Sequence, residues 1–258
     1  MIKIENISYG YKSNHPIFND ISLEIGNGIY GLLGENGVGK TTLIHLLCGL
    51  LFPWKGECSI DGMNPAKREP ALLSRYFFLP EEMQMPSESI SAFATRHSAF
   101  YPHFNHKEFE QNLEELKIDR KQKLSAVSYG QQKKAMLAYA FALHTPLLIL
   151  DEPTNGLDIT SRQALKRIIS RSIDDDSTLL ISTHQAHDFE NLLDHLIILG
   201  EGEILLKFCG PVRWTKSASA SSLPGQTVCP KTAFTANRNY LDISPCCLMK
   251  RKKKIHRI

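Results

Sequence analysis

An eight-residue glycine-rich segment constrains this chain more than any other part of its sequence. The segment GENGVGKT, Gly34–Thr41, follows an apolar run at 29–33 and precedes a largely apolar stretch at 42–50. Glycines carry no Cβ, so backbone N–H groups can converge on an anion, and a helix that begins near Lys40 adds the positive end of its dipole. This pattern, GxxxxGK[ST] between a strand and a helix, predicts a phosphate-binding loop.

The loop predicts a nucleoside triphosphate bound together with Mg²⁺. We expect Lys40 to reach the β- and γ-phosphates and the Thr41 hydroxyl to ligate Mg²⁺. The remaining residues expected to contact the nucleotide, from this segment and the position directly after it, are Gly34, Asn36, Gly37, Gly39 and Thr42.

Two adjacent acids follow a second apolar run. The segment LLIL at 147–150 is followed by Asp151 and Glu152. Ligands of a parallel sheet bind at the carboxyl ends of its strands, so we expect Asp151 to hold Mg²⁺ and Glu152 to orient or deprotonate the attacking water. Two acids after a strand also occur where a helix begins, since that end favours negative charge. The catalytic interpretation therefore depends on the phosphate-binding loop.

Apolar runs alternate with helical patterns along the chain. Short β-like runs occupy residues 1–30, buried-strand patterns recur at 147–150 and 177–184, and residues from about 86 to 143 are helical in pattern. Such alternation predicts an α/β fold with a largely parallel sheet covered on both faces. The helical stretch between two strands predicts an inserted helical subdomain.

The net charge of +3 is unevenly distributed. Residues 1–207 carry 20 basic and 26 acidic residues, whereas residues 208–258 carry 10 basic residues and one acid. We therefore expect an acidic domain at 1–207 and a basic, disordered tail at 208–258. Three interpretations of the tail stay open: a solvated extension, a segment that binds the anionic inner membrane leaflet, or sequence translated in a shifted frame.

Targeting and metal-binding signals are not found. No stretch has the ~18 uninterrupted apolar residues that a membrane span needs, and the first residues lack the pattern of a signal peptide. We expect a protein that is neither secreted nor inserted in a membrane by itself. None of the six cysteines forms a CxxC pair, which argues against a zinc or redox motif.

Several further motifs, in order, resemble the ABC ATPase family over residues 2–207. Residues 127–132, VSYGQQ, resemble the family signature LSGGQ, and residues 153–158, PTNGLD, resemble its D-loop. His184 resembles the switch histidine, and Tyr11 stands where the family places an aromatic against adenine, with Tyr9 as a competing candidate. The family usually has Gln after the strand at 75–80 as a Mg²⁺ and water ligand, whereas this chain has Glu81. Because a carboxylate oxygen also binds Mg²⁺, we expect Glu81 to take this role, with Gln84 nearby but three residues late.

The resemblance implies a fold, a partner and a mechanism. The fold is a P-loop NTPase with a mostly parallel core sheet, a small antiparallel β-subdomain and an inserted helical subdomain. Two such domains meet head to tail as a dimer, so that each ATP lies between the loop of one copy and the signature of the other. His184 would sense the γ-phosphate. The residues implied to contact the nucleotide across this interface are Ser128, Gly130, Gln131 and Asp158.

The resemblance also implies a transporter subunit that hydrolyses ATP. It would act with a separate integral membrane permease, on the cytoplasmic face of the cell membrane, and the glutamate at position 81 favours export by analogy with exporters. The alternative is a soluble ABC ATPase that acts on ribosomes or nucleic acid, although such relatives usually carry two cassettes or a long coiled coil. We expect no nucleic-acid partner. A hydrolysis-impaired regulator is disfavoured because Lys40, Asp151, Glu152 and His184 are all present.

Overall fold

Six strands form the central sheet, and five of them run parallel. The computed structural model describes residues 1–13, 15–189, 191–209, 214–216 and 239–241. The strand order is β5-β6-β7-β3-β8-β9, and only β9 is antiparallel to its neighbour. The strands are β3 (Gly28–Leu33), β5 (Tyr76–Leu79), β6 (Leu147–Asp151), β7 (Thr178–Thr183), β8 (His195–Gly200) and β9 (Glu203–Cys209).

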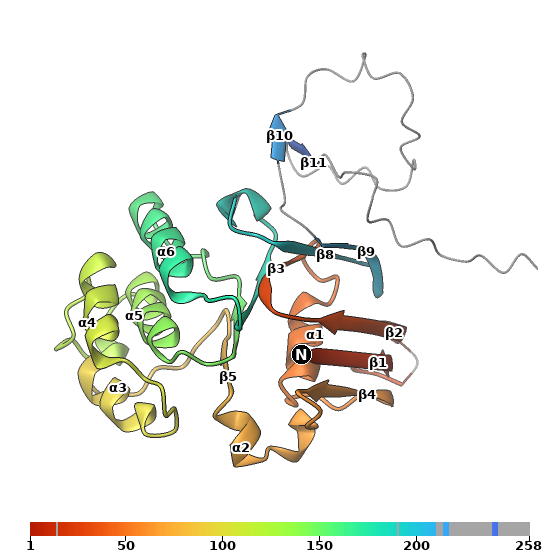
Figure 1. Ribbon diagram of the computed structural model, residues 1–258, viewed down its shortest axis with the longest axis horizontal. Helices are drawn as coiled ribbons and strands as arrows, with labels where there is room; N and C mark the ends of the chain where they lie inside the picture. The colour runs from red at the N-terminus through yellow and green to blue at the C-terminus, as the bar shows by residue number, and fades with distance from the viewer. Residues whose placement is uncertain (14, 190, 210–213, 217–238, 242–258) are drawn as a thin grey trace, which may run out of the picture.

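A smaller antiparallel sheet lies on one side of the central sheet (Figure 1). Its order is β2-β1-β4, and its strands are β1 (Ile2–Tyr9), β2 (Phe18–Ile25) and β4 (Lys55–Ile60). Helix α1 (Lys40–Leu47) lies beside it. Buried Ile2 and Ile4 alternate with more exposed neighbours along β1, the pattern of a strand with one covered face.

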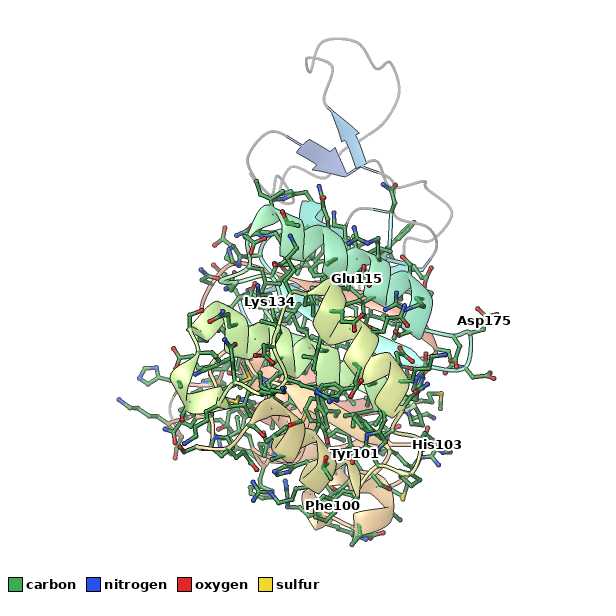
Figure 2. All side chains as sticks on the ribbon, turned by 90° about the vertical axis from the view of Figure 1, so that its left-hand side faces the viewer. Phe100, Tyr101, His103, Glu115, Lys134 and Asp175 are labelled. Atoms are coloured by element: carbon green, nitrogen blue, oxygen red, sulfur yellow. The ribbon has the colours of Figure 1, made fainter. Side chains whose placement is uncertain are left out.

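Most of the longer helices gather on the opposite side (Figure 1). They are α3 (Ile90–Ser98), α4 (His106–Glu115), α5 (Tyr129–Ala142) and α6 (Ile159–Ser172). Figure 2 turns this helical side toward the viewer, with Glu115 of α4 and Lys134 of α5 on it. The shorter elements are α2 (Pro70–Leu73), the 3₁₀ turns Pro65–Lys67, Leu124–Ala126 and Ala186–Phe189, and the paired strands β10 (Trp214–Lys216) and β11 (Asn239–Leu241).

The central sheet separates two hydrophobic cores. Along β6, Leu148 and Leu150 pack into the core formed with the helices, whereas Leu147 and Ile149 pack into the core formed with α1 and the antiparallel sheet. Because successive side chains of a strand point to opposite faces, a strand covered on both sides must be apolar throughout. The predicted α/β fold class with a largely parallel sheet is confirmed.

The structure bears on only some of the domain and subdomain boundaries that the sequence predicts. Strands β8 and β9 form a hairpin near residue 200, and helices α3, α4 and α5 lie between β5 and β6, where the inserted helical stretch was expected. The division at residue 207 and the limits of the helical subdomain stay predictions. The interpretations of the tail fall on residues 210–213, 217–238 and 242–258, outside the described residues. Within the described residues, no helix is both long enough and apolar enough to cross a membrane.

Candidate functional site

Four strand ends bring the candidate residues to one edge of the central sheet. Leu33 at the end of β3 pairs with Thr183 of β7, and Asp151 at the end of β6 pairs with Ser182 of β7. Strand β5 is in register with β6, since Leu79 pairs with Leu150. The phosphate-binding loop, the acid pair, His184 and Glu81 therefore all follow carboxyl ends of parallel strands, where such sheets bind ligands.

The phosphate-binding loop needs glycine at two positions for its backbone conformation. Gly37 has φ +83° and Gly39 has φ +108°, both in the region that side chains disfavour. A Cβ on Gly39 would also lie 2.9 Å from the Phe18 ring. Gly39 is the N-cap of α1 and supplies no side-chain cap, so N–H groups of the first turn are available to an anion.

Lys40 lies buried within this loop. Its side chain is 7% exposed, and its Nζ donates to the backbone oxygens of Gly34, at 2.8 Å, and Glu35, at 3.1 Å. The same Nζ lies 3.8 Å from Glu152 Oε1. The ammonium is thus held at the loop by acceptors that phosphate oxygens can replace.

Asp151 joins the loop to two strand ends. Its carboxylate is almost completely buried; Thr41 Oγ1 donates to Oδ2 at 2.8 Å, and Ser182 Oγ donates to Oδ1. A hydroxyl and a carboxylate side by side fit Mg²⁺, which prefers oxygen ligands and is commonly held by one or two carboxylates together with substrate phosphates. The described residues contain no cluster of three or more His, Cys, Asp or Glu suited to a metal, so an all-protein cage is not formed there.

Glu152 and His184 lie against each other beside Lys40. Glu152 is 5% exposed and has a left-handed backbone with φ +45°. Its backbone N–H donates to the backbone oxygen of Ser182 at 3.1 Å. His184 Nδ1 is 3.0 Å from Glu152 Oε2, and its Nε2 is 3.0 Å from Gln185 Nε2. A buried carboxylate between a lysine and a histidine is suited to accept a proton from water.

Tyr11, rather than Tyr9, faces the loop region. The Tyr11 hydroxyl is 3.3 Å from Thr42 Oγ1 on α1, and the residue is 64% exposed. Tyr9 is 7% exposed, and its ring packs edge-on against Tyr11 at 5.5 Å between centroids. The adenine-contact role thus stays a prediction for Tyr11, with Tyr9 in a supporting position.

The signature residues contact each other and the D-loop of the same chain. Ser128 is the N-cap of α5 and forms a capping box with Gln131. Gly130 lies so close to the D-loop that a Cβ would be 2.6 Å from the Gly156 oxygen. In Figure 1, α5 belongs to the helical side and α1 lies beside the antiparallel sheet. Contact of the signature with nucleotide stays a prediction that needs a second copy.

Asp158 caps helix α6. Its carboxylate accepts from the Ser161 N–H at 2.8 Å and from the Ser161 hydroxyl at 3.0 Å. These bonds, the backbone one first, lower the pKa of Asp158. Its local role is that of a helix cap, and its contact with nucleotide stays a prediction.

Glu81 is held at both its side chain and its backbone. Asn155 Nδ2 donates to Glu81 Oε1 at 2.7 Å, while the Tyr129 hydroxyl and Lys133 Nζ donate to the Glu81 backbone oxygen. Sequence reasoning missed Asn155 and Lys133 as neighbours of the site, and it also missed Ser182. Ser182 could have been suspected, since it lies two residues before His184 on a strand expected to end at the site.

Comparison with known proteins identifies the chain. The ABC transporter family matches residues 18–155, which are more than half of the sequence. A putative ABC transporter ATP-binding protein of Methanosarcina acetivorans is 30% identical over 214 residues, covering 79% of this chain and 76% of that protein. A solved ATP-binding subunit of an ABC transporter superposes with a TM-score of 0.73 at 26% identity, covering 81% and 90% of the two chains.

A third relative shares the fold. It is a dimeric ATP-binding cassette bound to ADP and Pi, with a TM-score of 0.69 and 20% identity, covering 81% of this chain and 98% of that one. Fold and site together define an ATP-hydrolysing ATPase of the ABC class. The chain belongs to the ABC transporter family, as an ATP-binding subunit.

Proposed function

We propose that this chain is the ATP-hydrolysing subunit of a transporter, and that it drives export through a separate membrane-spanning subunit. The observation that supports this best is the meeting of Lys40, Asp151, Glu152 and His184 at one sheet edge. These groups comprise a phosphate-binding cation, a Mg²⁺ ligand, a base and a residue that orients the base.

Each of these groups has a proposed role in ATP hydrolysis. Lys40 exchanges the oxygens of Gly34 and Glu35 for phosphate oxygens when ATP binds. Glu152 orients the attacking water and takes its proton, while His184 holds the carboxylate in place and contacts the γ-phosphate.

Magnesium fits beside these groups. Thr41 and Asp151 would hold Mg²⁺, with Glu81 nearby, and the bound ion would neutralise charge on the phosphates. Tyr11 would lie against the adenine.

The active form is proposed to be a head-to-tail dimer. In this chain the signature and D-loop residues lie against each other, and the candidate phosphate ligands lie on the loop before α1. A second copy would bring Ser128, Gly130 and Gln131 to the phosphates bound by the first, and Asp158 to the same interface. The solved cassette that shares this fold was captured as a dimer with ADP and Pi.

The ATPase assignment can be tested with one substitution and its control. Glu152→Gln removes the base and keeps the shape, so we expect ATP to bind while turnover falls by about 10²- to 10⁴-fold. Glu114→Gln makes the same chemical change at an exposed position of α4 and should turn over ATP like the wild type. Wild-type turnover in Glu152→Gln would remove the catalytic assignment.

The transport assignment needs the partner. We expect the full chain, tagged and recovered from native membranes in mild detergent, to bring down a polytopic membrane protein in near-equal amount. This would show that the subunit associates with a membrane protein, and the proposed location of the complex has the subunit on the cytoplasmic face. Recovery of ribosomal proteins instead would favour the soluble alternative. Transport by reconstituted vesicles that hold the pair would then fix the direction.

A further inference from the structure

Lys133 is a completely buried lysine on the second turn of α5. Its side chain has 0% exposure, whereas the next residue, Lys134, is partly exposed and lies on the side shown in Figure 2. The Lys133 ammonium lies within bonding distance of three backbone oxygens, those of Pro80 at 3.4 Å, Glu81 at 3.2 Å and Asp151 at 3.3 Å. Burying an ammonium is costly unless such partners compensate, so the arrangement is specific.

The three oxygens belong to the two strand ends that carry the acidic candidates for Mg²⁺. Pro80 and Glu81 directly follow β5, and Asp151 is the last residue of β6. Lys133 therefore joins two neighbouring strand ends to each other and both of them to helix α5. The same helix begins with the signature residues, so its position and that of the acidic groups are mechanically linked.

Tyr129 adds a second bond from the same helix. It lies one turn before Lys133, its hydroxyl donates to the Glu81 oxygen, and its ring centroid is 5.9 Å from the Lys133 Nζ, where a cation–π attraction operates. The Glu81 backbone oxygen thus receives two donors from α5, while the Glu81 carboxylate receives the amide of Asn155. Both ends of Glu81 are fixed.

The charges around the lysine are those of the site itself. The carboxylates of Glu81, Asp151 and Glu152 all raise the pKa of Lys133, while burial lowers it more strongly. A cation at this place offsets part of the electrostatic repulsion among the three carboxylates.

We propose that Lys133 is a positioning residue for ATP hydrolysis, which holds the segments of Glu81 and Asp151 in the arrangement that binds Mg²⁺–ATP, and that Tyr129 and Lys133 together couple α5 to Glu81. This inference rests on the proposed function of the same site. It assigns Lys133 no contact with substrate.

Binding of ATP with and without Mg²⁺ tests the proposal apart from turnover. The Kd of a fluorescent ATP analogue is measured on the full chain in Mg²⁺ and in EDTA. The ratio of the Kd in EDTA to the Kd in Mg²⁺ reports how much Mg²⁺ strengthens binding. In Lys133→Met we expect this ratio to fall about tenfold, as for other groups that orient metal ligands, while the Kd in EDTA stays near the wild-type value. ATP turnover at saturating substrate should fall by a similar factor.

Two further variants make the test decisive. Lys107→Met removes the same charge from an exposed position of α4 and should leave the ratio unchanged. Tyr129→Phe keeps the ring but loses the hydroxyl, and should lower the ratio about threefold. Since Tyr129 is 40% exposed, this variant decides the question if Lys133→Met fails to fold.

The outcomes separate the two proposals. A wild-type protein that does not bind ATP overturns the proposed function. A wild-type protein whose binding is strengthened by Mg²⁺, with an unchanged ratio in Lys133→Met and Tyr129→Phe, overturns the positioning role alone. A wild-type ratio near one also overturns it, because no carboxylates would then need to be held in place.

Discussion

The stability of the protein should depend on pH through Lys133. Burial lowers the pKa of this lysine to about 8 in the folded chain, from the value of 10.5 that is ordinary for lysine. At a pH below both values the lysine is charged in the folded and unfolded states alike. Between them the unfolded chain holds more protons than the folded one, so the free energy of unfolding contributed by Lys133 rises with pH. Replacement by Met removes this rise.

The size of the effect follows from the pKa values. A fall from 10.5 to about 8 corresponds to about 3 kcal/mol of differential free energy. The stability of the wild type relative to Lys133→Met should therefore rise by about 3 kcal/mol from near pH 7 to above pH 10. Burial raises the pKa of Cys58 and Tyr76 to about 12 each, which makes stability fall with alkaline pH, but both proteins carry these groups and the difference cancels them.

Urea unfolding followed by circular dichroism measures this difference. Both proteins are titrated at several pH values under reducing conditions, with Lys107→Met as the exposed-lysine control, which should follow the wild type throughout. A difference between wild type and Lys133→Met that stays constant with pH, or that shrinks as pH rises, would refute the reasoning.

Three other changes test separate parts of the structure. Gly39→Ala forces a side chain into φ +108° and against the Phe18 ring, so ATP affinity should fall at least about tenfold in an equilibrium binding assay, and unchanged affinity would contradict the role of the loop. Ile149→Ala opens a cavity at a fully buried strand position and should lower the free energy of unfolding by about 2–5 kcal/mol in urea. A smaller loss would mean that the surrounding core collapses into the cavity. Asn105→Ala removes the N-cap of α4, whose side chain accepts from the Glu108 N–H, and should cost about 1 kcal/mol; no loss would mean that water replaces the cap.

Much of the fold followed from short-range sequence patterns. The apolar runs of β3, β6 and β7 predicted a parallel sheet because strands buried on both faces have no polar side. The loop between β3 and α1 was predictable because its glycines and lysine have fixed spacing. What the patterns could not provide was the order of the strands, since hydrophobic periodicity does not specify a neighbour.

The site was predictable where chemistry and spacing coincide, and not elsewhere. Lys40 and Thr41 lie in a motif, and Asp151 stands at a strand end, so each had a local signal. The contacts of Glu81 had no such signal, although Asn155 lies within the segment that resembles the D-loop. Asn155 and Lys133 reach Glu81 from 74 and 52 residues away, and a buried lysine has the same appearance in sequence as a solvated one.

The contact between Gly130 and Gly156 has a consequence for any surface that meets this part of the chain. No side chain fits between the two backbones, and a Cβ on Gly156 would lie 3.0 Å from the Tyr129 ring. The start of helix α5 and the turn before α6 are therefore in direct backbone contact, so a facing molecule meets the two segments together. Gly130→Ala would push these two segments apart. It should weaken self-association, while each separate chain still binds ATP.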